Sequence, residues 1–418
     1  MKGARGRVLM FVENHFPADP RVKNEADMLT SAGYFVTVVG LRGKKDKVAS
    51  RILDGIQVYL IPKVTLFIKT RKENPTGIQR FWLKVVALLG YMWEYVYFTG
   101  ACFVMSLYVA MKHGFDVIHA HNPPDTLFLV AALYKPFGKK FVFDHHDLCP
   151  ELYRSRYKAE EGFLTAMLRL FEKGSLKLAD VTIATNESYR AIQIERGKVK
   201  PENVFVVRNG PNLNRVTYRT PSERLRSMNK CILCYVGALN PQDGVDYLLR
   251  SLRDLVYTLN RKDFYCVIMG SGDSLEDLRA LAKDLNLESY AELTGFVSEE
   301  DLMSNLSAAD ICVDPDPSSP LNDVSTWIKI MEYMALGKPI VTYDLKETRW
   351  SAQDAAFYVK PNNELEFAEG IAKLMDRPDL RAQMGEFGRQ RVHRDLKWDV
   401  VGQNLLRAYA KLFKNSGQ

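Results

Sequence analysis

Cysteine is scarce in this chain: only 6 occur among 418 residues, and all of them lie in or beside apolar runs. Cys231 and Cys234 form a CxxC pair, but no second CxxC or histidine pair is present to complete a zinc site. The surrounding segment, "KCILCYVGAL", is typical of a buried strand, in which residues three apart point to opposite faces. We therefore expect structural cysteines and a reducing compartment.

Several motifs of common enzyme classes are also missing. The sequence has neither the GxGxxG dinucleotide fingerprint nor the GxxxxGK(S/T) phosphate loop, which disfavours nicotinamide dehydrogenases and P-loop nucleotidases. It has no HExxH motif and no nucleophile elbow. We expect no secretory signal, because the first apolar run, "RVLMFVEN", is short and reaches Glu13 at once.

One long apolar segment, residues 80–114, has a length that raises the question of a membrane. Residues 95–111 are uncharged and approach the lower length limit of a spanning helix. The strand-like runs on either side belong to one expected sheet, which a single crossing would split. We therefore expect a pair of helices that touch a bilayer surface, with Arg80, Lys84 and Lys112 at the margins. A spanning helix is the alternative.

The overall composition is that of a globular protein, 47% hydrophobic and 26% charged. A net charge of +7 favours anionic partners, but it does not choose among nucleotides, phospholipid surfaces and nucleic acid. A chain of 418 residues is too long for one ordinary core, so two domains are expected.

Strand-like and helix-like segments alternate along the chain, which indicates parallel sheets covered on both faces. The strand-like runs include "RVLMFVEN", "FVTVVG", "DVIHAHN", "KKFVFDHHD", "DVTIATN" and "NVFVVRNG", and the pattern restarts with "CILCYVGAL" after a polar break near residues 211–229. We predict an α/β fold of two Rossmann-like doubly wound domains facing across a cleft. The predicted boundaries are residues 1–215 and 225–395, followed by one amphipathic helix at 396–418 that packs back toward the N-terminal domain.

Polar residues and glycines gather where the predicted strands end, which is where open parallel sheets bind ligands. They are Asn14, His15, His119, His121, His145, His146, Arg208, Gly237, Gly270 and Asp314. This set holds five of the 7 histidines, which favours a functional reading over a structural one.

Two short motifs at these strand ends have open interpretations. "MGSGD", residues 269–273, precedes a helix and is either a plain turn or a cradle for an anion. "DPD", residues 314–316, could place two carboxylates on a divalent metal, but no further ligand cluster is evident, so we expect no metal.

The segment "NDVSTWIKIMEYMALGKPIV", residues 322–341, reads as a helix ended by Gly337. Most of its faces are apolar, which is typical of a buried helix. The exceptions recur at helical spacing and are expected to form one polar stripe. They are Asn322, Ser325, Lys329 and Glu332.

These motifs together resemble the retaining glycosyltransferases of family 4, which have two Rossmann-like domains in the GT-B arrangement. The resemblance runs nearly end to end, through "DVIHAHN", "HDL", "RNG", "YVG", "GSG", "LTGFV" and, most specifically, "EYMALGKPIV". In that family the glutamate matched by Glu332 binds the ribose hydroxyls of a sugar nucleotide, and the histidine matched by His146 contacts the donor sugar. The polar stripe would then face a nucleotide-sugar pocket.

The resemblance implies further site residues. The donor would be bound by the residues of the glycine turns, by those after the "LTG" and "RNG" motifs, and by the start of the polar stripe. They are Gly237, Gly270, Ser271, Gly272, Phe296, Val297, Asn209, Asn322 and Ser325. The N-terminal domain would hold the acceptor, with Arg21 and His121 beside it.

The sequence departs from the family pattern at three positions. The first glutamate of the family's helix falls at Val324, and Ala238 and Asp243 stand where typical members carry an arginine and a lysine. The charge of the diphosphate would therefore be met by Arg208, Lys329 and the helix N-terminus at Gly272. A Lys329–Glu332 ion pair is the alternative for the lysine.

The resemblance implies a retaining, metal-independent hexosyltransferase that needs no cofactor beyond its co-substrate. It would move a sugar from a UDP- or GDP-sugar to a glycan or lipid-linked acceptor in cell-surface polysaccharide synthesis. We expect a cytoplasmic protein on the inner membrane face, with no nucleic acid partner. Two alternatives stay open: a non-catalytic sugar-nucleotide or glycan-binding protein, motivated by the three departures, and a nucleotide-sugar epimerase of related fold.

Overall fold

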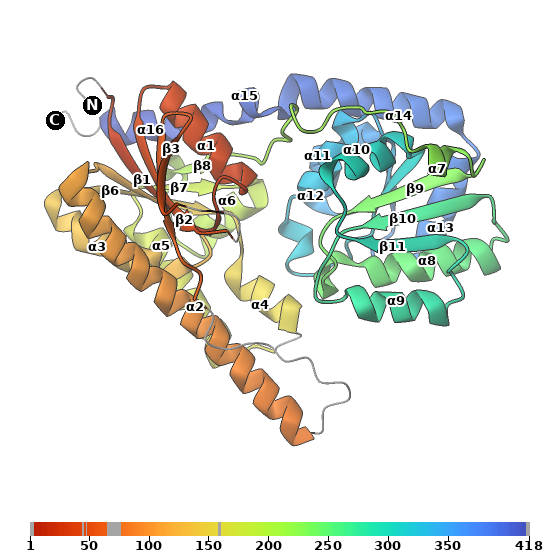
Figure 1. Ribbon diagram of the computed structural model, residues 1–418, viewed down its shortest axis with the longest axis horizontal. Coiled ribbons are helices and arrows are strands. Elements are labelled where there is room, and N and C mark those ends of the chain that lie inside the picture. The colour runs from red at the N-terminus through yellow and green to blue at the C-terminus, as the bar shows by residue number, and fades with distance from the viewer. Residues whose placement is uncertain (1–3, 44–45, 47, 65–76, 158–159, 415–418) are drawn as a thin grey trace. The chain divides into compact units, whose positions relative to one another are not determined.

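The computed structural model describes residues 4–43, 46, 48–64, 77–157 and 160–414. The chain divides into two compact units (Figure 1). Unit 1 comprises residues 1–150, 162–207 and 402–418, and unit 2 comprises residues 151–161 and 208–401. Both units are α/β, as predicted.

Unit 1 is built on an eight-stranded sheet of order β3-β4-β2-β1-β5-β6-β7-β8. Its strands are β1 (Arg7–His15), β2 (Phe35–Leu41), β3 (Ser50–Leu53), β4 (Ile56–Ile61), β5 (Val117–His121), β6 (Lys140–His145), β7 (Val181–Ala184) and β8 (Val204–Val206). Neighbouring strands are parallel except β3 and β4, which form an antiparallel hairpin. The hairpin turns at Asp54 and Gly55, both with positive φ.

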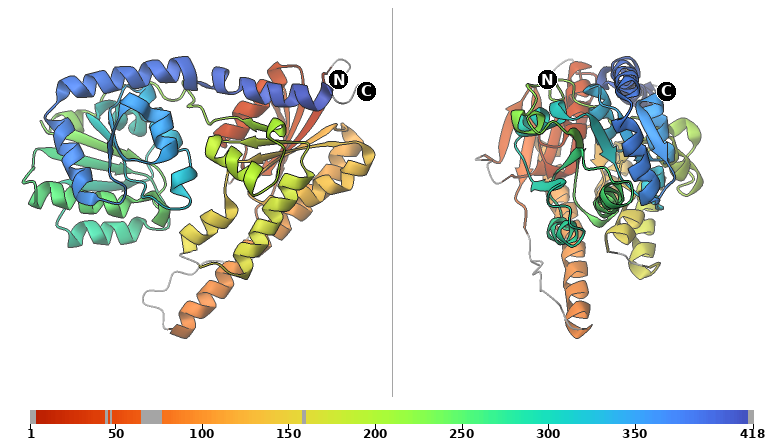
Figure 2. Two further views of the ribbon diagram at one scale, coloured as in Figure 1. Left: turned by 180° about the vertical axis from the view of Figure 1, so that it is seen from behind. Right: turned by 90° about the vertical axis from the view of Figure 1, so that its right-hand side faces the viewer.

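All but the last helix of unit 1 connect these strands. They are α1 (Pro20–Ser31), α2 (Gly77–Lys112), α3 (Phe128–Tyr134), α5 (Phe163–Leu178) and α6 (Glu187–Glu195), with α16 (Gln403–Lys414) at the C-terminal end of the unit. Helix α4 (Cys149–Tyr157) follows β6 and belongs mostly to unit 2. Helix α1 begins at Pro20, because the Asp19 carboxylate accepts the backbone amide of Val22 and Pro20 occupies the first turn. Figure 2 shows the blue α16 against the sheet of unit 1, where it packs on β7 and β8.

The long apolar segment forms one helix, α2, and not the predicted pair. It spans 36 residues and packs against α3. By length and composition, Met92–Lys112 could cross a membrane, and only 28% of the apolar window is buried. The side chains of Arg80 and Lys84, expected at a bilayer margin, lie outside the described part of the chain.

Unit 2 contains a six-stranded, fully parallel sheet of order β11-β10-β9-β12-β13-β14. Its strands are β9 (Cys231–Val236), β10 (Phe264–Met269), β11 (Ala291–Gly295), β12 (Ile311–Asp314), β13 (Ile340–Tyr343) and β14 (Ala356–Val359). Its helices are α7 (Glu223–Arg226), α8 (Val245–Tyr257), α9 (Leu275–Asp284), α10 (Glu299–Ala308), α11 (Ile328–Ala335), α12 (Lys346–Ala352), α13 (Glu364–Met375), α14 (Pro378–Arg391) and α15 (Trp398–Val401).

Side chains of successive residues on β9 enter two different cores, one on each face of the sheet. Leu233 packs with α8, α9 and α13, whereas Ile232 packs with α10 and α11. Cys231 contacts the first core and Cys234 belongs to the second, and neither is in a disulfide. The CxxC pair therefore spans a strand, as predicted, and cannot hold one ion.

Two connecting segments differ from expectation. Residues 211–229, predicted as the joint between domains, belong to unit 2, because Val216 and Leu225 are buried in its core. The predicted single C-terminal helix is interrupted between α15 and α16, where Gly402 disfavours helix continuation and unit 2 gives way to unit 1.

Candidate active site

Helix α11 places the two charged residues that the sequence singled out. Its apolar side chains, from Ile330 to Met334, are buried in the core of unit 2. Lys329 and Glu332 are three residues apart and share one side of the helix. They are only 7% and 6% exposed, so each needs a partner of opposite charge.

The polar stripe is shorter than predicted. Helix α11 begins at Ile328, and Asn322–Val324 form a separate 3-10 turn. The Asn322 amide donates to two backbone carbonyls and the Ser325 hydroxyl donates to a third, which stabilises the loop in a non-helical conformation. The prediction that Asn322 and Ser325 share a helical face with Glu332 is wrong.

Lys329 lies between two aspartates at the end of β12. Its Nζ is 3.0 Å from Asp314 Oδ1 and 2.5 Å from Asp316 Oδ2. Burial alone would lower the pKa of Lys329, but the two carboxylates hold it well above its usual value. The rings of Tyr235 and Trp327 lie 5.0 and 5.4 Å from the ammonium.

This arrangement bears on three interpretations of the sequence. The alternative Lys329–Glu332 pair is wrong, because the lysine has other partners. The charge that was assigned to a diphosphate is already compensated by Asp314 and Asp316, which argues against that role. The "DPD" carboxylates bind an ammonium, so they do not form a free pair for a metal.

Glu332 is paired with Arg215, which lies in the polar break of residues 211–229 and was not predicted as a site residue. Burial raises the pKa of Glu332, and the Arg215 charge opposes that rise. The arginine side chain is 39% exposed and lines a cavity of about 800 Å³, whose lining also includes Glu299, Glu300 and Asp301 in the acidic first turn of α10. Arg215 therefore lies between the buried Glu332 carboxylate and an open polar cavity.

The two glycine turns of unit 2 pack directly on each other. A Cβ on Gly270, which has φ of 149°, would lie 1.8 Å from the Gly237 carbonyl oxygen, and one on Gly272 would lie 2.3 Å from that of Leu239. These glycines are thus required by the close approach of two backbones. Helix α9 begins at Leu275, so its N-terminus is not at Gly272 as predicted.

Two amides of the second turn stay available for an anion. Among the described residues, the backbone N–H groups of Ser271 and Gly272 have no acceptor. Successive N–H groups in such turns bind phosphate oxygens. The turn is therefore compatible with an anion cradle.

The other residues predicted to bind the donor differ in their partners and in their exposure to solvent. Arg208 Nη1 donates to Glu347 Oε2 at 3.1 Å, and its guanidinium lies 3.4 Å from the centroid of the Trp350 ring. This pairing compensates its charge and argues against the predicted catalytic role. Phe296 is 86% exposed, whereas Val297 and Asn209 are half-buried.

Unit 1 contains a second charged cluster, at the carboxyl end of β6. Arg21 Nε and Nη2 donate to the two oxygens of Asp144, both at 2.7 Å, and Nη1 donates to the Val207 carbonyl at 3.0 Å. Arg21 Nη2 also lies 3.2 Å from Glu25 Oε1. Arg21 is therefore buried in a network, which contradicts its predicted place beside an acceptor.

Two histidines of β5 complete this cluster. His121 Nδ1 lies 2.9 Å from Asp144 Oδ2, and its ring stacks on His119 with centroids 4.3 Å apart. His119 in turn contacts the Tyr409 hydroxyl of α16 at 3.0 Å. His121 is fully buried and bonded to Asp144, which argues against its predicted place beside the acceptor.

The cluster contains four donor groups that could in principle hold a cation: Glu25, His119, His121 and Asp144, with ligand atoms within 4.8 Å of one another. Arg21 already supplies the positive charge between the two carboxylates. Burial would raise the pKa of Asp144, but Arg21 and His121 hold it well below its usual range. A guanidinium in this position fits a metal ion poorly.

His146 has a more open setting than His119, His121 and His145, which are fully buried, whereas His15 at the end of β1 is exposed. His146 follows β6, is half-buried, and its backbone amide donates to Asn122 Oδ1 at 2.8 Å. Within the described chain, the buried Nε2 of His146 has no hydrogen-bond partner. His145, by contrast, is fully buried beside Glu172 at 3.1 Å.

Comparison with known proteins decides the family. The profile "Glycosyltransferase Family 4" matches residues 21–215, and the profile "Glycosyl transferases group 1" matches residues 219–391. The chain belongs to glycosyltransferase family 4. Similar relatives include the alpha-D-kanosaminyltransferase of Streptomyces kanamyceticus, which is 30% identical over 39% of this chain and 41% of that protein.

Another relative of this family 4 chain is a GDP-mannose-dependent mannosyltransferase of Corynebacterium glutamicum that acts on a monoacylated phosphatidylinositol monomannoside. It is 25% identical over 47% of this chain and 53% of that protein. The match thus spans about half the length of these two relatives.

Solved structures match over the whole chain and have the GT-B fold. Sucrose-phosphate synthase from Thermosynechococcus elongatus has a TM-score of 0.72 at 17% identity, covering 98% of this chain and 100% of that one. Anabaena HepE, crystallised with UDP and glucose, has a TM-score of 0.69 at 16% identity, covering 97% and 100%. At these identities the likeness establishes the fold.

Proposed function

We propose that this family 4 chain transfers a sugar from a nucleoside diphosphate sugar, a UDP- or GDP-sugar, to a glycan or lipid-linked acceptor. The observation that carries the proposal is the pairing of the buried Glu332 with Arg215, whose side chain lines a polar cavity in unit 2. A carboxylate behind such an arginine can accept both hydrogen bonds of a ribose diol once the arginine moves aside.

The departing diphosphate needs positive partners, because its charge develops as the bond to the sugar breaks. Lys329 and Arg208 are compensated by carboxylates, so we assign this role to the amides of Ser271 and Gly272 and to the displaced Arg215. His146, with an unpartnered Nε2, would contact the donor sugar. The reaction would be retaining and would need neither a metal nor a further cofactor.

The acceptor side of the proposal rests on unit 1 and its helix α2. The apolar stretch of α2 is largely unburied, and the strands nearest to it in sequence, β4 and β5, belong to one sheet. A helix whose two ends return to one sheet is suited to lying on a bilayer. We therefore propose a cytoplasmic enzyme on a membrane surface that takes part in cell-surface polysaccharide synthesis.

A second candidate is a non-catalytic sugar-nucleotide-binding protein. Asp243 favours this candidate, because its carboxylate stands where family members carry a cation. Asp243 Oδ2 accepts a hydrogen bond from the backbone N–H of Asn240 at 2.9 Å. Such a protein would bind a donor without turning it over.

The test is a thermal-shift screen with UDP, GDP and their common sugar conjugates, followed by assays of transfer and donor hydrolysis. A ligand at a hundred times its dissociation constant adds roughly 2.7 kcal/mol to the free energy of unfolding. Stabilisation with turnover supports the transferase, and stabilisation without turnover supports the binding protein. If none of the nucleotides and nucleotide sugars stabilises the protein, both the transferase and the binding-protein proposals are wrong.

A further inference from the structure

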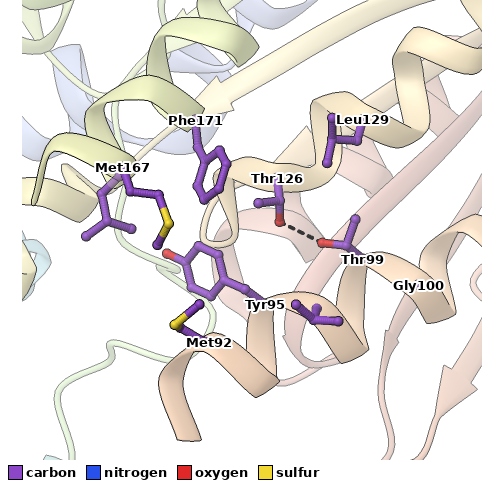
Figure 3. A pocket seen from close by; sticks show the side chains of 10 residues that line it. Met92, Tyr95, Thr99, Gly100, Thr126, Leu129, Met167 and Phe171 are labelled. Carbon is purple, nitrogen blue, oxygen red and sulfur yellow. Dashed lines mark hydrogen bonds between the residues drawn. The ribbon is translucent and has the colours of Figure 1, made fainter. Parts of the chain in front are cut away.

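Unit 1 contains an apolar hollow whose lining includes none of the residues assigned above to the donor site. It lies among α2, the turn before α3, and α5, and it has a volume of about 280 Å³ (Figure 3). It is lined by Met92, Tyr95, Val96, Thr99, Gly100, Thr126, Leu129, Met167, Leu168 and Phe171.

The lining offers little to a polar ligand. The hydroxyl groups of Thr99 and Thr126 bond to each other at 2.6 Å, as the dashed line in Figure 3 shows. The remaining lining consists of aliphatic, aromatic and thioether groups, apart from the Tyr95 hydroxyl. A ligand for this hollow gains from burial of apolar surface and not from directed hydrogen bonds.

The hollow opens onto an apolar surface. Three lining residues, Met92, Val96 and Leu129, are themselves 38%, 65% and 49% exposed. Beyond the hollow, α2 continues with exposed Val104 and Met111. No charged residue lies between positions 95 and 111, so this stretch of α2 exposes apolar side chains without a charge among them.

The size of the hollow restricts what can fill it. An α-helix with its side chains is about 10–12 Å across, which is too wide for a pocket below the usual 300–1,000 Å³ of small-molecule sites. A single hydrocarbon chain is narrow, flexible and entirely apolar, and it matches both the volume and the lining.

We propose that this hollow, defined by α2, α3 and α5, binds one hydrocarbon chain of a bilayer lipid. The proposal rests on the membrane contact stated under the proposed function. The exposed apolar face of α2 meets the bilayer, and a lipid chain passes from the bilayer into the hollow between α2 and α5. For a lipid-linked acceptor, this would hold the anchor of the substrate.

Gly100 gives a direct way to close the hollow. It lines the cavity within α2, and a Cβ added there would meet nothing within 4 Å. Gly100→Leu therefore fills the space without a backbone clash and replaces a poor helix former with a good one. Val104→Leu is the matched control, since Val104 lies one turn further along α2 and outside the lining.

The experiment uses the full chain with phosphatidylglycerol vesicles that carry a photoactivatable diazirine near the end of one acyl chain. After irradiation, labelled residues are mapped by mass spectrometry. We expect labels on Met167 and Phe171 of α5 in the parent protein and in Val104→Leu. In Gly100→Leu these labels should fall by at least about tenfold, because each buried methylene contributes roughly fourfold to binding.

Each other outcome overturns the proposal. Labels confined to Val104 and Met111 would mean that the bilayer touches α2 without entering the hollow. Labels on α5 that persist in Gly100→Leu would place the chain elsewhere, and crosslinks to a second protein molecule would make the face an interface. Absence of vesicle binding would overturn the membrane contact itself.

Two measurements keep these outcomes interpretable. The melting temperature of Gly100→Leu should equal or exceed that of the parent, which excludes misfolding as the cause of lost labels. Stabilisation by nucleotide sugars is measured without vesicles, so failure of lipid binding and failure of the proposed transfer are distinguishable.

Discussion

The two units bury their charges in parallel ways, with one cation between two carboxylates in each. In unit 1 Arg21 lies between Asp144 and Glu25, and in unit 2 Lys329 lies between Asp314 and Asp316. In each cluster the pKa of one carboxyl is lowered by the cation despite burial, and that of the other is raised by burial and by its neighbour.

The difference lies in what each cation connects. Arg21 joins α1 to β6 and, through the Val207 carbonyl, to the end of β8, whereas Lys329 joins α11 to a single strand end. The planar guanidinium bonds three groups in fixed directions, while the ammonium is a point charge among carboxylates and aromatic rings. Both cations are buried together with their carboxylates. In this protein, a buried and fully paired charged motif therefore stabilises the fold and does not contact a substrate. In the third pair, Arg215 is 39% exposed and lines an open cavity, while its partner Glu332 is buried.

The largest expected effect is that of Lys329→Met. The variant keeps the stem but leaves Asp314 and Asp316 buried without their cation, so the free energy of unfolding should fall by about 3–5 kcal/mol. Chemical denaturation measures this directly. Lys338→Met is the matched control: Lys338 donates to the carbonyls of Ser307 and Ala309, both at 2.8 Å, lies over the Tyr218 ring, and has no carboxylate partner within the described chain. This variant should lose about 1–2 kcal/mol. If Lys329→Met keeps its stability but loses turnover, the lysine acts on the diphosphate.

The sequence was sufficient to predict both parallel sheets, because buried strands and amphipathic helices alternate with a clear period. It also contained the signal for the hairpin that we did not predict, in the Asp54-Gly55 turn. The start of α11 was not predictable from periodicity, because side-chain bonds from Asn322 and Ser325 override the helical pattern of 322–327.

The sequence predicted which residues of the candidate site carry charge, but it did not predict which residues pair with each other. The sequence singled out Lys329, Glu332 and "DPD" separately, and only the fold shows that the lysine lies between the two aspartates. Arg215 had no signal beyond its charge, since its pairing with Glu332 joins residues 117 positions apart. Local pattern carries no information about contacts at such separation.

Glu332→Gln tests the partly exposed pair against the two buried ones. The amide keeps the shape but loses one acceptor for a ribose diol, so donor binding should weaken by about 1.5–3 kcal/mol, roughly ten- to a hundredfold. Its stability should change by less than about 1 kcal/mol, because Arg215 is partly exposed. Donor titration followed by thermal shift gives both values. Glu292→Gln, which removes a surface pair with Arg224, is the control and should bind the donor normally.

Arg21→Lys tests whether geometry or charge holds the cluster in unit 1. Lysine preserves the charge but cannot bond both Asp144 oxygens and the Val207 carbonyl together, so the loss should be about 1–3 kcal/mol. Arg7→Lys is the matched control: Arg7 also grips both oxygens of an aspartate, Asp116, but the pair is partly exposed and should change stability by less than about 1 kcal/mol. Equal losses in the two variants would mean that burial adds nothing to the Arg21 network.

The smallest effects are expected from replacing the second carboxyl of each cluster, in Glu25→Gln and Asp316→Asn. Burial raises the pKa of both groups well above their ordinary values of 4.5 and 3.8, and the neighbouring aspartate adds to each rise. Each carboxyl is therefore protonated in the folded protein at mildly acidic pH, and an amide reproduces the neutral group. Near pH 4 the variants should differ from the parent by less than about 1 kcal/mol.

The pH dependence of that difference is the sharper test. A carboxyl whose pKa is raised by folding contributes stability that is complete below its unfolded pKa and is lost as the pH rises toward the folded pKa. The amide variants have no such loss. Their free energy of unfolding relative to the parent should therefore increase with pH above about 4.5, by up to roughly 1.4 kcal/mol per pH unit for each site.

Asp144→Asn is the opposite case, because Arg21 holds the pKa of Asp144 low. The free energy of unfolding of this variant should be much lower than that of the parent at neutral pH, and the difference should shrink as the pH falls. A difference that does not vary with pH in Glu25→Gln or Asp316→Asn would show that both carboxyls of that cluster are ionised, and would end the likeness between the two clusters.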